Sequence, residues 1–169
     1  MSGGEVIVLN GPAGVGTTTV ASRIAVRRPG TVNIAGDLLR GFLPGDARGH
    51  LGAGPTYRAG AALAQAYLDM GAPRVLFDYV FNDAGAIGVF RRGLRPGTPV
   101  HVCTLWAPLE VVQRRERTRE GREPLGERVT HTWAALDRNR HALGTVIHNT
   151  GAPDDAAAEI LRSIAAGGP

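Results

Sequence analysis

The sequence contains no lysine, and all 19 of its basic residues are arginine. Cysteine is almost absent as well, because Cys103 stands alone, and this excludes a disulfide or a cysteine-based metal site within one chain. No apolar stretch reaches the roughly 20 residues that a membrane-spanning helix needs, and no signal-peptide pattern is present. We therefore expect a cytoplasmic protein with no membrane partner.

A long basic run is also missing. The 19 basic residues are interspersed with 15 acidic ones, which leaves a net charge of +4. Arginine is concentrated between Arg114 and Arg128, a distribution that suits one anionic ligand better than an extended polyanion. We expect no nucleic-acid partner, and a protein that is a monomer or a small homo-oligomer.

The length and the hydrophobic pattern predict a single α/β domain over residues 1–169. A chain of 169 residues with 43% hydrophobic content can bury one core. Short apolar runs alternate with longer helical patterns, which is typical of a parallel sheet. The expected strands are Val6–Asn10, Val32–Ala35, Arg74–Tyr79, Val100–Leu105 and Thr145–His148. The expected helices are Thr17–Arg27, Thr56–Met70, Asp83–Gly93, Pro108–Arg119, Thr130–Leu143 and Pro153–Ala165.

One stretch between these elements is irregular. Residues Gly41 to Pro55 are rich in glycine and also contain Pro44, which predicts a mobile loop beside the second strand. Loops in such positions often determine which substrate an enzyme accepts.

The residues Gly11 to Thr18, GPAGVGTT, follow the first apolar run and match the P-loop pattern except at one position. In a P-loop, glycines let successive backbone N–H groups face one anion, and the helix that follows directs its positive end to the same point. The pattern requires lysine at position 17, where this chain has threonine. A glycine-rich turn without a ligand is the alternative. The predicted nucleotide-binding residues here are Gly11, Ala13, Gly14, Val15, Gly16, Thr17, Thr18 and Thr19.

The absent lysine has a measurable consequence. Losing one charge-assisted phosphate contact costs about 1.5 to 3 kcal/mol of binding. Losing a donor that acts in the transition state often costs about 100- to 1000-fold in rate. Thr17 offers only a neutral hydroxyl, and no other lysine exists. An arginine elsewhere would offset part of the loss, because guanidinium binds phosphate through two donors.

A magnesium site is predicted from Thr18 and Asp78. Asp78 ends the apolar run Val75-Leu76-Phe77, and open parallel sheets bind their ligands at the carboxyl ends of strands. Magnesium prefers hydroxyl, carboxylate and phosphate oxygens. The alternative for Asp78 is a turn cap.

Asp37 follows the second strand and is the candidate catalytic base. A carboxylate in this place can accept the proton of a substrate hydroxyl that attacks a phosphate. The alternative is an N-cap for a short helix over residues 38–42. Arg40 lies three residues later, on the same helical face, and either pairs with Asp37 or binds an acceptor anion.

The segment from Arg114 to Arg128 is predicted to be a lid over a polyphosphate. Arg115, Arg119 and Arg122 fall on one face of a continuing helix, where like charges repel unless an anion lies among them. In this interpretation they stabilise negative charge in the transition state. The alternative is a solvated surface helix.

Other polar and aromatic residues give weaker signals. Tyr79, Phe81 and Asn82 follow Asp78 and are candidates for the acceptor pocket, with simple packing as the alternative. The five histidines show no metal-ligand spacing, and Cys103, Trp106 and Trp133 are interpreted as structural.

With these motifs, the chain resembles the small P-loop kinases, the group that contains chloramphenicol phosphotransferase, zeta-toxin-like, adenylylsulfate and shikimate kinases. The matching segments are VIVLNGPAGVGTTT, IAGDLLR, RVLFDYVF and LWAPLEVVQRRERTREGR. The resemblance implies a three-layer fold with a five-stranded parallel sheet, and ATP with magnesium as cosubstrates. It implies Asp37 as the base, Thr18 and Asp78 beside magnesium, lid arginines at Arg115, Arg119 or Arg122, and Thr150 in the adenine-side loop. Thr17 and Tyr79 depart from the pattern, because a lysine and a second acidic residue are expected there.

These observations favour an ATP-dependent phosphotransferase that acts on a hydroxyl of an antibiotic, a nucleoside or a sugar-like metabolite. Two alternatives are open. One is a nucleotide-binding protein that has lost catalysis, and the other is a P-loop that binds a phosphorylated substrate for different chemistry. ATP and GTP are not distinguished by the sequence.

Overall fold

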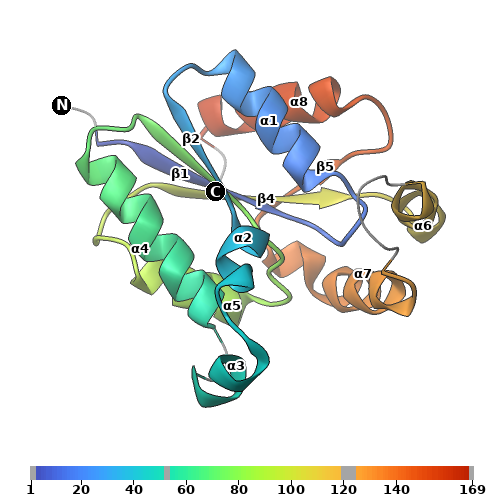
Figure 1. The fold of residues 1–169 in the computed structure, drawn as a ribbon. Coiled ribbons are helices and arrows are strands. Elements are labelled where there is room, and N and C mark those ends of the chain that lie inside the picture. The colour runs from blue at the N-terminus through green and yellow to red at the C-terminus, as the bar shows by residue number, and fades with distance from the viewer. Residues whose placement is uncertain (1–2, 52–53, 119–124, 168–169) are drawn as a thin grey trace.

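The fold is a five-stranded, all-parallel sheet covered by helices on both faces, as expected for the three-layer P-loop class (Figure 1). The structure is a computed structural model, and it describes residues 3–51, 54–118 and 125–167. The strands are β1 (Glu5–Asn10), β2 (Thr31–Ala35), β3 (Arg74–Asp78), β4 (Val100–Trp106) and β5 (Thr145–His148). Their order in the sheet is β2-β3-β1-β4-β5, and every neighbouring pair is parallel.

Strand β1 lies at the centre because its side chains are apolar on both faces. Val6 and Val8 point to one side of the sheet, and Ile7 and Leu9 point to the other, as the alternation of a strand requires. All four are fully buried. A strand covered on both faces appears in sequence as a continuous apolar run, so the alternating pattern of a half-exposed strand is missing here.

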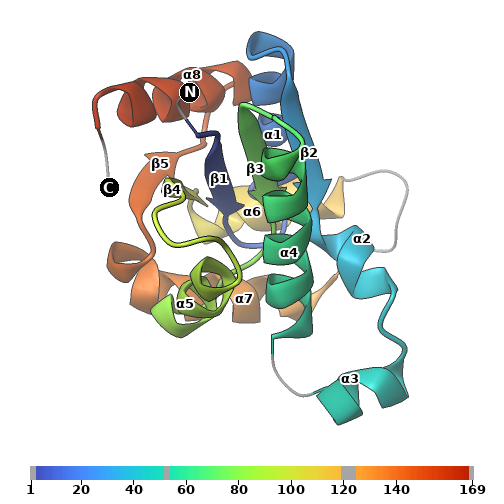
Figure 2. The ribbon, with the colours of Figure 1, turned by 90° about the vertical axis from the view of Figure 1, so that its left-hand side faces the viewer.

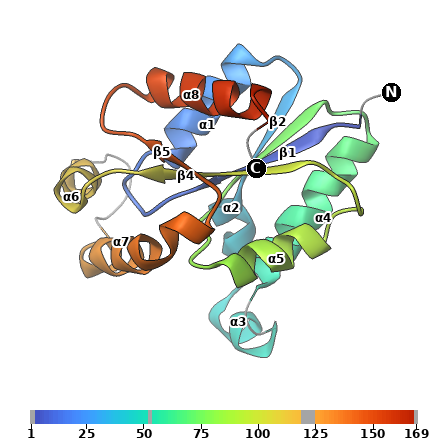
Figure 3. The same ribbon diagram turned by 180° about the vertical axis from the view of Figure 1, so that it is seen from behind.

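The main helices divide between the two faces. Helices α1 (Thr17–Arg27) and α8 (Pro153–Ala165) cover the face that carries Ile7 and Leu9. Helices α4 (Pro55–Asp69), α5 (Ala84–Arg92) and α7 (Glu127–Asn139) lie on the opposite face, as the view from behind shows (Figure 3). None of the helices in the described part of the chain is long and apolar enough to cross a membrane.

Three shorter helices and a 3-10 turn lie around the carboxyl ends of the strands or along the connections. They are α2 (Gly36–Gly41), α3 (Gly45–Leu51), α6 (Leu109–Arg117) and the turn Arg140–Ala142. Helix α3 corrects the sequence-based expectation of an irregular loop over Gly41 to Pro55, because residues Gly45–Leu51 of that stretch are helical. It stands away from the sheet (Figure 2). Asp46 in its first turn complements the positive end of the helix, a local signal that the glycines obscured.

The helix ends around the lid also differ from expectation. Helix α6 ends at Arg117, two residues early, and the hydroxyl of the next residue, Thr118, donates to the carbonyls of Arg114 and Arg115. Such local side-chain bonds compete with continuation of a helix. Helix α7 begins at Glu127, three residues early, with an acidic side chain in its first turn. The expected 119–122 continuation of α6 lies outside the described residues.

Candidate functional site

A cleft opens at the carboxyl ends of the parallel strands. Its volume is about 900 Å³. Five parts of the chain line it: the P-loop, helix α2, the residues after β3, the described ends of the lid, and the loop from β5 to α8. This is the edge where open α/β sheets bind ligands, because the strand-to-helix loops all meet there.

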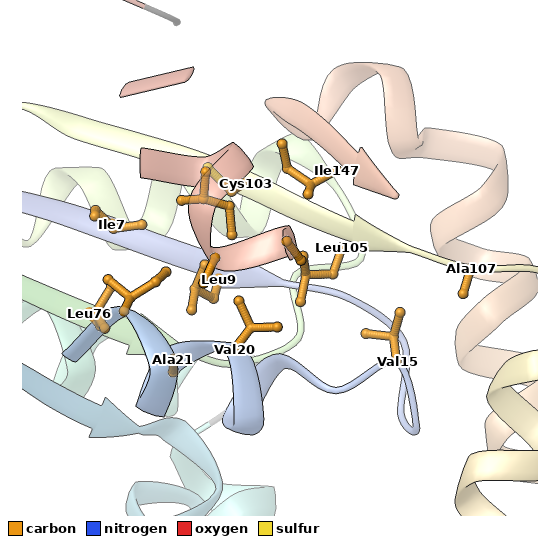
Figure 4. Packing of buried hydrophobic residues seen from close by; sticks show 14 of the residues in the cluster. Ile7, Leu9, Val15, Val20, Ala21, Leu76, Cys103, Leu105, Ala107 and Ile147 are labelled. Carbon is orange, nitrogen blue, oxygen red and sulfur yellow. The ribbon is translucent and has the colours of Figure 1, made fainter. Parts of the chain in front are cut away.

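The P-loop adopts a conformation that needs its glycines. Gly14 and Gly16 have φ angles of 84° and 100°, in the left-handed region that side chains disfavour. A Cβ atom on Gly14 would also lie 2.6 Å from the carbonyl oxygen of Val112. Val15, between the two glycines, is fully buried and packs in the same cluster as Leu105 and Ala107 (Figure 4). The Val15 side chain therefore attaches the loop to the core, and Ala13 packs against the same cluster, while the loop residues line the cleft.

Helix α1 directs its positive end toward the cleft. It begins at Thr17, its N-cap residue is Gly16, and no side chain caps it. Its first turn contains no acidic residue, and Thr17, Thr18 and Thr19 all line the cleft. The free N–H groups of a first helical turn attract anions, so this arrangement fits a phosphate group.

Asn10 connects the P-loop to strand β4 and to the segment after β3, and it was not among the candidate residues expected from the sequence. Its side-chain oxygen accepts hydrogen bonds from the amides of Gly11 and Phe81, each at 2.8 Å. Its side-chain nitrogen donates to the Phe81 carbonyl and to the Thr104 hydroxyl, each at 3.1 Å. The side chain is fully buried. The side-chain amide of asparagine offers both a donor and an acceptor, and this position uses both. The sequence did contain an indication of this role, because Asn10 is a polar residue that ends an apolar strand just before the P-loop.

Thr18 and Asp78 meet across the cleft. The hydroxyl of Thr18 donates to the Asp78 carboxylate at 2.7 Å. Asp78 is 8% exposed and stands opposite Leu9 in the strand pairing, which places it beside the start of the P-loop. Among the described residues, no group of three or more His, Cys, Asp or Glu side chains gathers for a metal. The pair supplies hard oxygen atoms of the kind magnesium prefers, and phosphate and water oxygens would complete its coordination.

Asp37 and Arg40 extend from helix α2 into the wall of the cleft. The helix begins at Gly36 and its N-cap residue is Ala35, so the N-cap interpretation of Asp37 is wrong. Gly36 is required by contact, because a Cβ there would lie 2.6 Å from the ring of Tyr79. That contact brings the start of α2 against the residue that follows Asp78.

The three residues proposed for the acceptor pocket lie in different environments. Tyr79 lines the cleft, whereas Asn82 is exposed and accepts a hydrogen bond from Asn139 outside it. Phe81 is fully buried, and its ring packs among those of Tyr57, Phe77 and Phe90. Neither Phe81 nor Asn82 is among the cleft-lining residues.

Val80 lines the cleft between these positions, and Tyr57 holds its backbone. The Tyr57 hydroxyl donates to the Val80 carbonyl at 3.0 Å. The pKa of Tyr57 is raised from 10.0 to about 12. Burial is the largest cause, and the nearby Tyr79 and Asp83 raise it further. The hydroxyl therefore stays protonated and able to donate at any physiological pH.

The predicted lid arginines divide between described and undescribed residues. Arg115 lines the cleft, and its guanidinium donates to the carbonyls of Val15 at 3.2 Å, Asn149 at 2.7 Å and Gly151 at 3.5 Å. Arg119 and Arg122 lie outside the described residues. Arg128, in the first turn of α7, also lines the cleft.

The loop after β5 contributes a different residue from the one expected. Thr150 is exposed and is not among the cleft-lining residues. Its neighbour Asn149 does line the cleft, is 2% exposed, and donates from its side chain to the Val15 carbonyl at 2.7 Å. Like Asn10, it is a buried asparagine at the carboxyl end of a strand.

Comparison with known proteins gives a family and a set of similar folds. The sequence family described as AAA domain matches residues 6–143. No curated protein matches the chain. The tunicamycin resistance protein of Deinococcus radiodurans has a similar solved structure, with 26% sequence identity, a TM-score of 0.70 and 95% of each chain covered.

Two kinases of known structure share the fold. A gluconokinase from Sinorhizobium meliloti 1021 has 20% identity and a TM-score of 0.71, with 98% of this chain and 94% of the enzyme covered. The shikimate kinase from Acinetobacter baumannii, solved in complex with shikimate, has 22% identity and a TM-score of 0.60, with 97% and 94% covered.

Proposed function

Because the chain belongs to the AAA domain family and its fold is shared by small-molecule kinases, we propose that it is an ATP-dependent phosphotransferase acting on a hydroxyl of a small molecule. One observation carries the proposal. A single cleft contains the P-loop, the Thr18–Asp78 pair and the Asp37 carboxylate. These are an anion site, a pair of hard oxygen ligands and a base, which together are what phosphoryl transfer requires.

The proposed reaction forms one bond and breaks another. The acceptor oxygen attacks the γ-phosphorus of ATP, and the bond from that phosphorus to the β–γ bridging oxygen breaks, so ADP leaves. Asp37 takes the proton of the acceptor hydroxyl. Helix α2 places this carboxylate on the cleft wall.

The residues around Asp78 fit magnesium. Thr18 and Asp78 would hold the ion, which when bound neutralises charge on the phosphates. Asp78 is almost fully buried at the end of β3, so its carboxylate has little freedom to turn away from Thr18.

The charge that Thr17 does not supply is proposed to come from arginine. Arg40 and Arg128 line the cleft, and neither forms an ion pair with another described residue. Arg128 lies within the proposed lid, whereas Arg40 is beside Asp37 and suits the acceptor side. Guanidinium binds phosphate through two donors and stays charged at any physiological pH. Arg119 and Arg122 are further lid candidates, in the part of the lid that the structure does not describe.

The experiment is phosphorus NMR of the protein with Mg·ATP and a panel of hydroxylated antibiotics, nucleosides and sugars. Tunicamycin belongs in the panel because one similar structure is a tunicamycin resistance protein. We expect a new phosphate-ester resonance with at least one acceptor. Asp37→Asn should abolish transfer, while the affinity for ATP changes less than about threefold, because only the base is lost.

Asp46→Asn is the matched control. Asp46 is also an acidic residue in the first turn of a short helix, and it is exposed and outside the cleft. Its variant should retain transfer. A loss of ATP affinity in Asp37→Asn as large as the loss of transfer would assign Asp37 a structural role.

A nucleotide-binding protein without catalysis is the second candidate, and Thr17 is the observation that favours it. ATP binding without transfer to any acceptor in the panel would support this candidate and contradict the kinase.

A further inference from the structure

Two donors from different elements converge on one carbonyl of the P-loop. The Val15 oxygen accepts a hydrogen bond from Arg115 Nη1 at 3.2 Å and another from Asn149 Nδ2 at 2.7 Å. Arg115 lies on α6 and Asn149 follows β5. In the sequence, Val15 is 100 residues from Arg115 and 134 residues from Asn149. The Val15 side chain is fully buried. The carbonyl is therefore held from outside the loop while the side chain is held by the core.

Holding this carbonyl also sets the direction of the next amide. In a planar trans peptide the C=O and N–H bonds point in opposite directions, and the described residues contain no cis peptide. The amide that shares its peptide plane with the Val15 carbonyl belongs to Gly16. Gly16 has a φ of 100° and lines the cleft, and its N–H has no hydrogen-bond partner among the described residues. With the carbonyl bound on one side, the N–H is directed to the other.

The same guanidinium joins the P-loop to the loop after β5. Nη1 of Arg115 also donates to the Asn149 carbonyl at 2.7 Å, and Nη2 reaches the Gly151 carbonyl at 3.5 Å. Gly16 lets Asn149 approach, because a Cβ there would lie only 3.2 Å from its Nδ2. A guanidinium is planar and has several donors in fixed directions, so it can donate to carbonyls of two loops at once. A lysine ammonium on its flexible side chain does this poorly.

We propose that Arg115 is a positioning residue for phosphate binding: it orients the Val15–Gly16 peptide so that the Gly16 amide faces the cleft, and its charge polarises that peptide from behind. A carbonyl that accepts a charge-assisted bond makes the amide of the same peptide a stronger donor. The P-loop of this chain thus has a positive charge beside the Val15 carbonyl, on the side away from the Gly16 amide, although it lacks the usual lysine on the side of the phosphate. This inference rests on the proposed function, because it concerns how the same loop binds a polyphosphate.

The test measures phosphate binding without any acceptor or turnover. Tripolyphosphate, without divalent cations, is titrated into the protein by calorimetry and followed in the ¹H–¹⁵N spectrum through the Gly16 amide resonance. The variants are Arg115→Met, which removes charge and donors, and Arg115→Lys, which keeps the charge. Arg117→Met is the matched control, because Arg117 is an exposed arginine of the same helix with no side-chain bond to the P-loop.

We expect Arg115→Met to weaken tripolyphosphate binding about tenfold and to abolish most of the Gly16 amide shift on binding. Arg115→Lys should weaken it about threefold or more, and Arg117→Met less than twofold. A lower melting temperature for Arg115→Met with unchanged affinity and an unchanged Gly16 shift would overturn the proposal, because the role would then be structural only. If Arg115→Met does not fold, Arg115→Lys decides: wild-type affinity in that variant overturns the proposal.

The two proposals fail in different ways. Absence of phosphoryl transfer to every acceptor, with tripolyphosphate binding that depends on Arg115, contradicts the kinase and supports the positioning role. Transfer that occurs normally in Arg115→Met contradicts the positioning role and supports the kinase. A wild-type protein that does not bind tripolyphosphate overturns both.

Discussion

Replacing Asn10 by alanine should destabilise the whole protein, because Asn10 joins strand β1 to strand β4 and to the segment after β3 at the base of the cleft. Its amide oxygen accepts from the backbone amides of Gly11 and Phe81, and its nitrogen donates to the Phe81 carbonyl and the Thr104 hydroxyl. Thr104 retains its own bond to the Leu143 carbonyl at 2.6 Å. Three buried backbone groups therefore lose this partner: the amide of Gly11, and the amide and the carbonyl of Phe81.

The expected cost follows from those three groups. An unsatisfied buried donor or acceptor costs about 1 to 3 kcal/mol, so the sum is about 3 to 9 kcal/mol. Water entering the vacated space would satisfy some of them, which favours the lower part of that range. A domain of this size has about 5 to 15 kcal/mol of total stability. The variant should be marginally folded, with its P-loop and the residues after β3 no longer held together.

Urea unfolding measures this difference, with Asn33→Ala as the matched control. Asn33 is exposed on the edge strand β2, and the same substitution there should change the free energy of unfolding by less than about 0.5 kcal/mol. Thr104→Val is a milder second variant, expected to cost about 1 to 2 kcal/mol. If Asn10→Ala is less than about 1 kcal/mol more destabilising than Asn33→Ala, the bonds seen here do not support the site.

Two further predictions concern the missing charge and a buried thiol. Thr17→Lys should tighten ATP binding by about tenfold or more, since a charge-assisted phosphate contact contributes about 1.5 to 3 kcal/mol; unchanged affinity by calorimetry would show that the loop does not lack a cation. Burial raises the pKa of the Cys103 thiol from 9.0 to about 12. Between these pH values the unfolded chain loses a proton that the folded chain keeps, so stability falls as pH rises, by up to about 1.4 kcal/mol per pH unit from this group. Cys103→Ala should make the decline between pH 9 and 11 shallower in urea unfolding, and equal slopes for both proteins would refute the assignment.

Local chemistry was sufficient to predict most of the fold. Helices α1 and α8 have the bounds expected from the sequence, and so does strand β5. Helix α8 begins with proline followed by two acidic residues, a pattern that depends only on neighbours in the chain. The parallel sheet was expected because short apolar runs alternate with longer helical patterns along the chain. The short helix α3 was missed because glycines at its start and in its middle favoured a loop.

The sequence by itself determined which chemistry is present: a P-loop without lysine, a carboxylate at or just after the end of each of two strands, and arginine as the only permanently charged basic side chain. Tertiary structure decided the partners. Strand pairing places Leu9 beside Asp78 and Asn10 beside Thr104, and these contacts join residues 69 and 94 positions apart. Whether Arg115 contacts solvent, an anion or a carbonyl depends on such long-range packing, which no local pattern encodes. The missing lysine was visible in the sequence, whereas the arginine that holds the loop from behind became visible only in the fold.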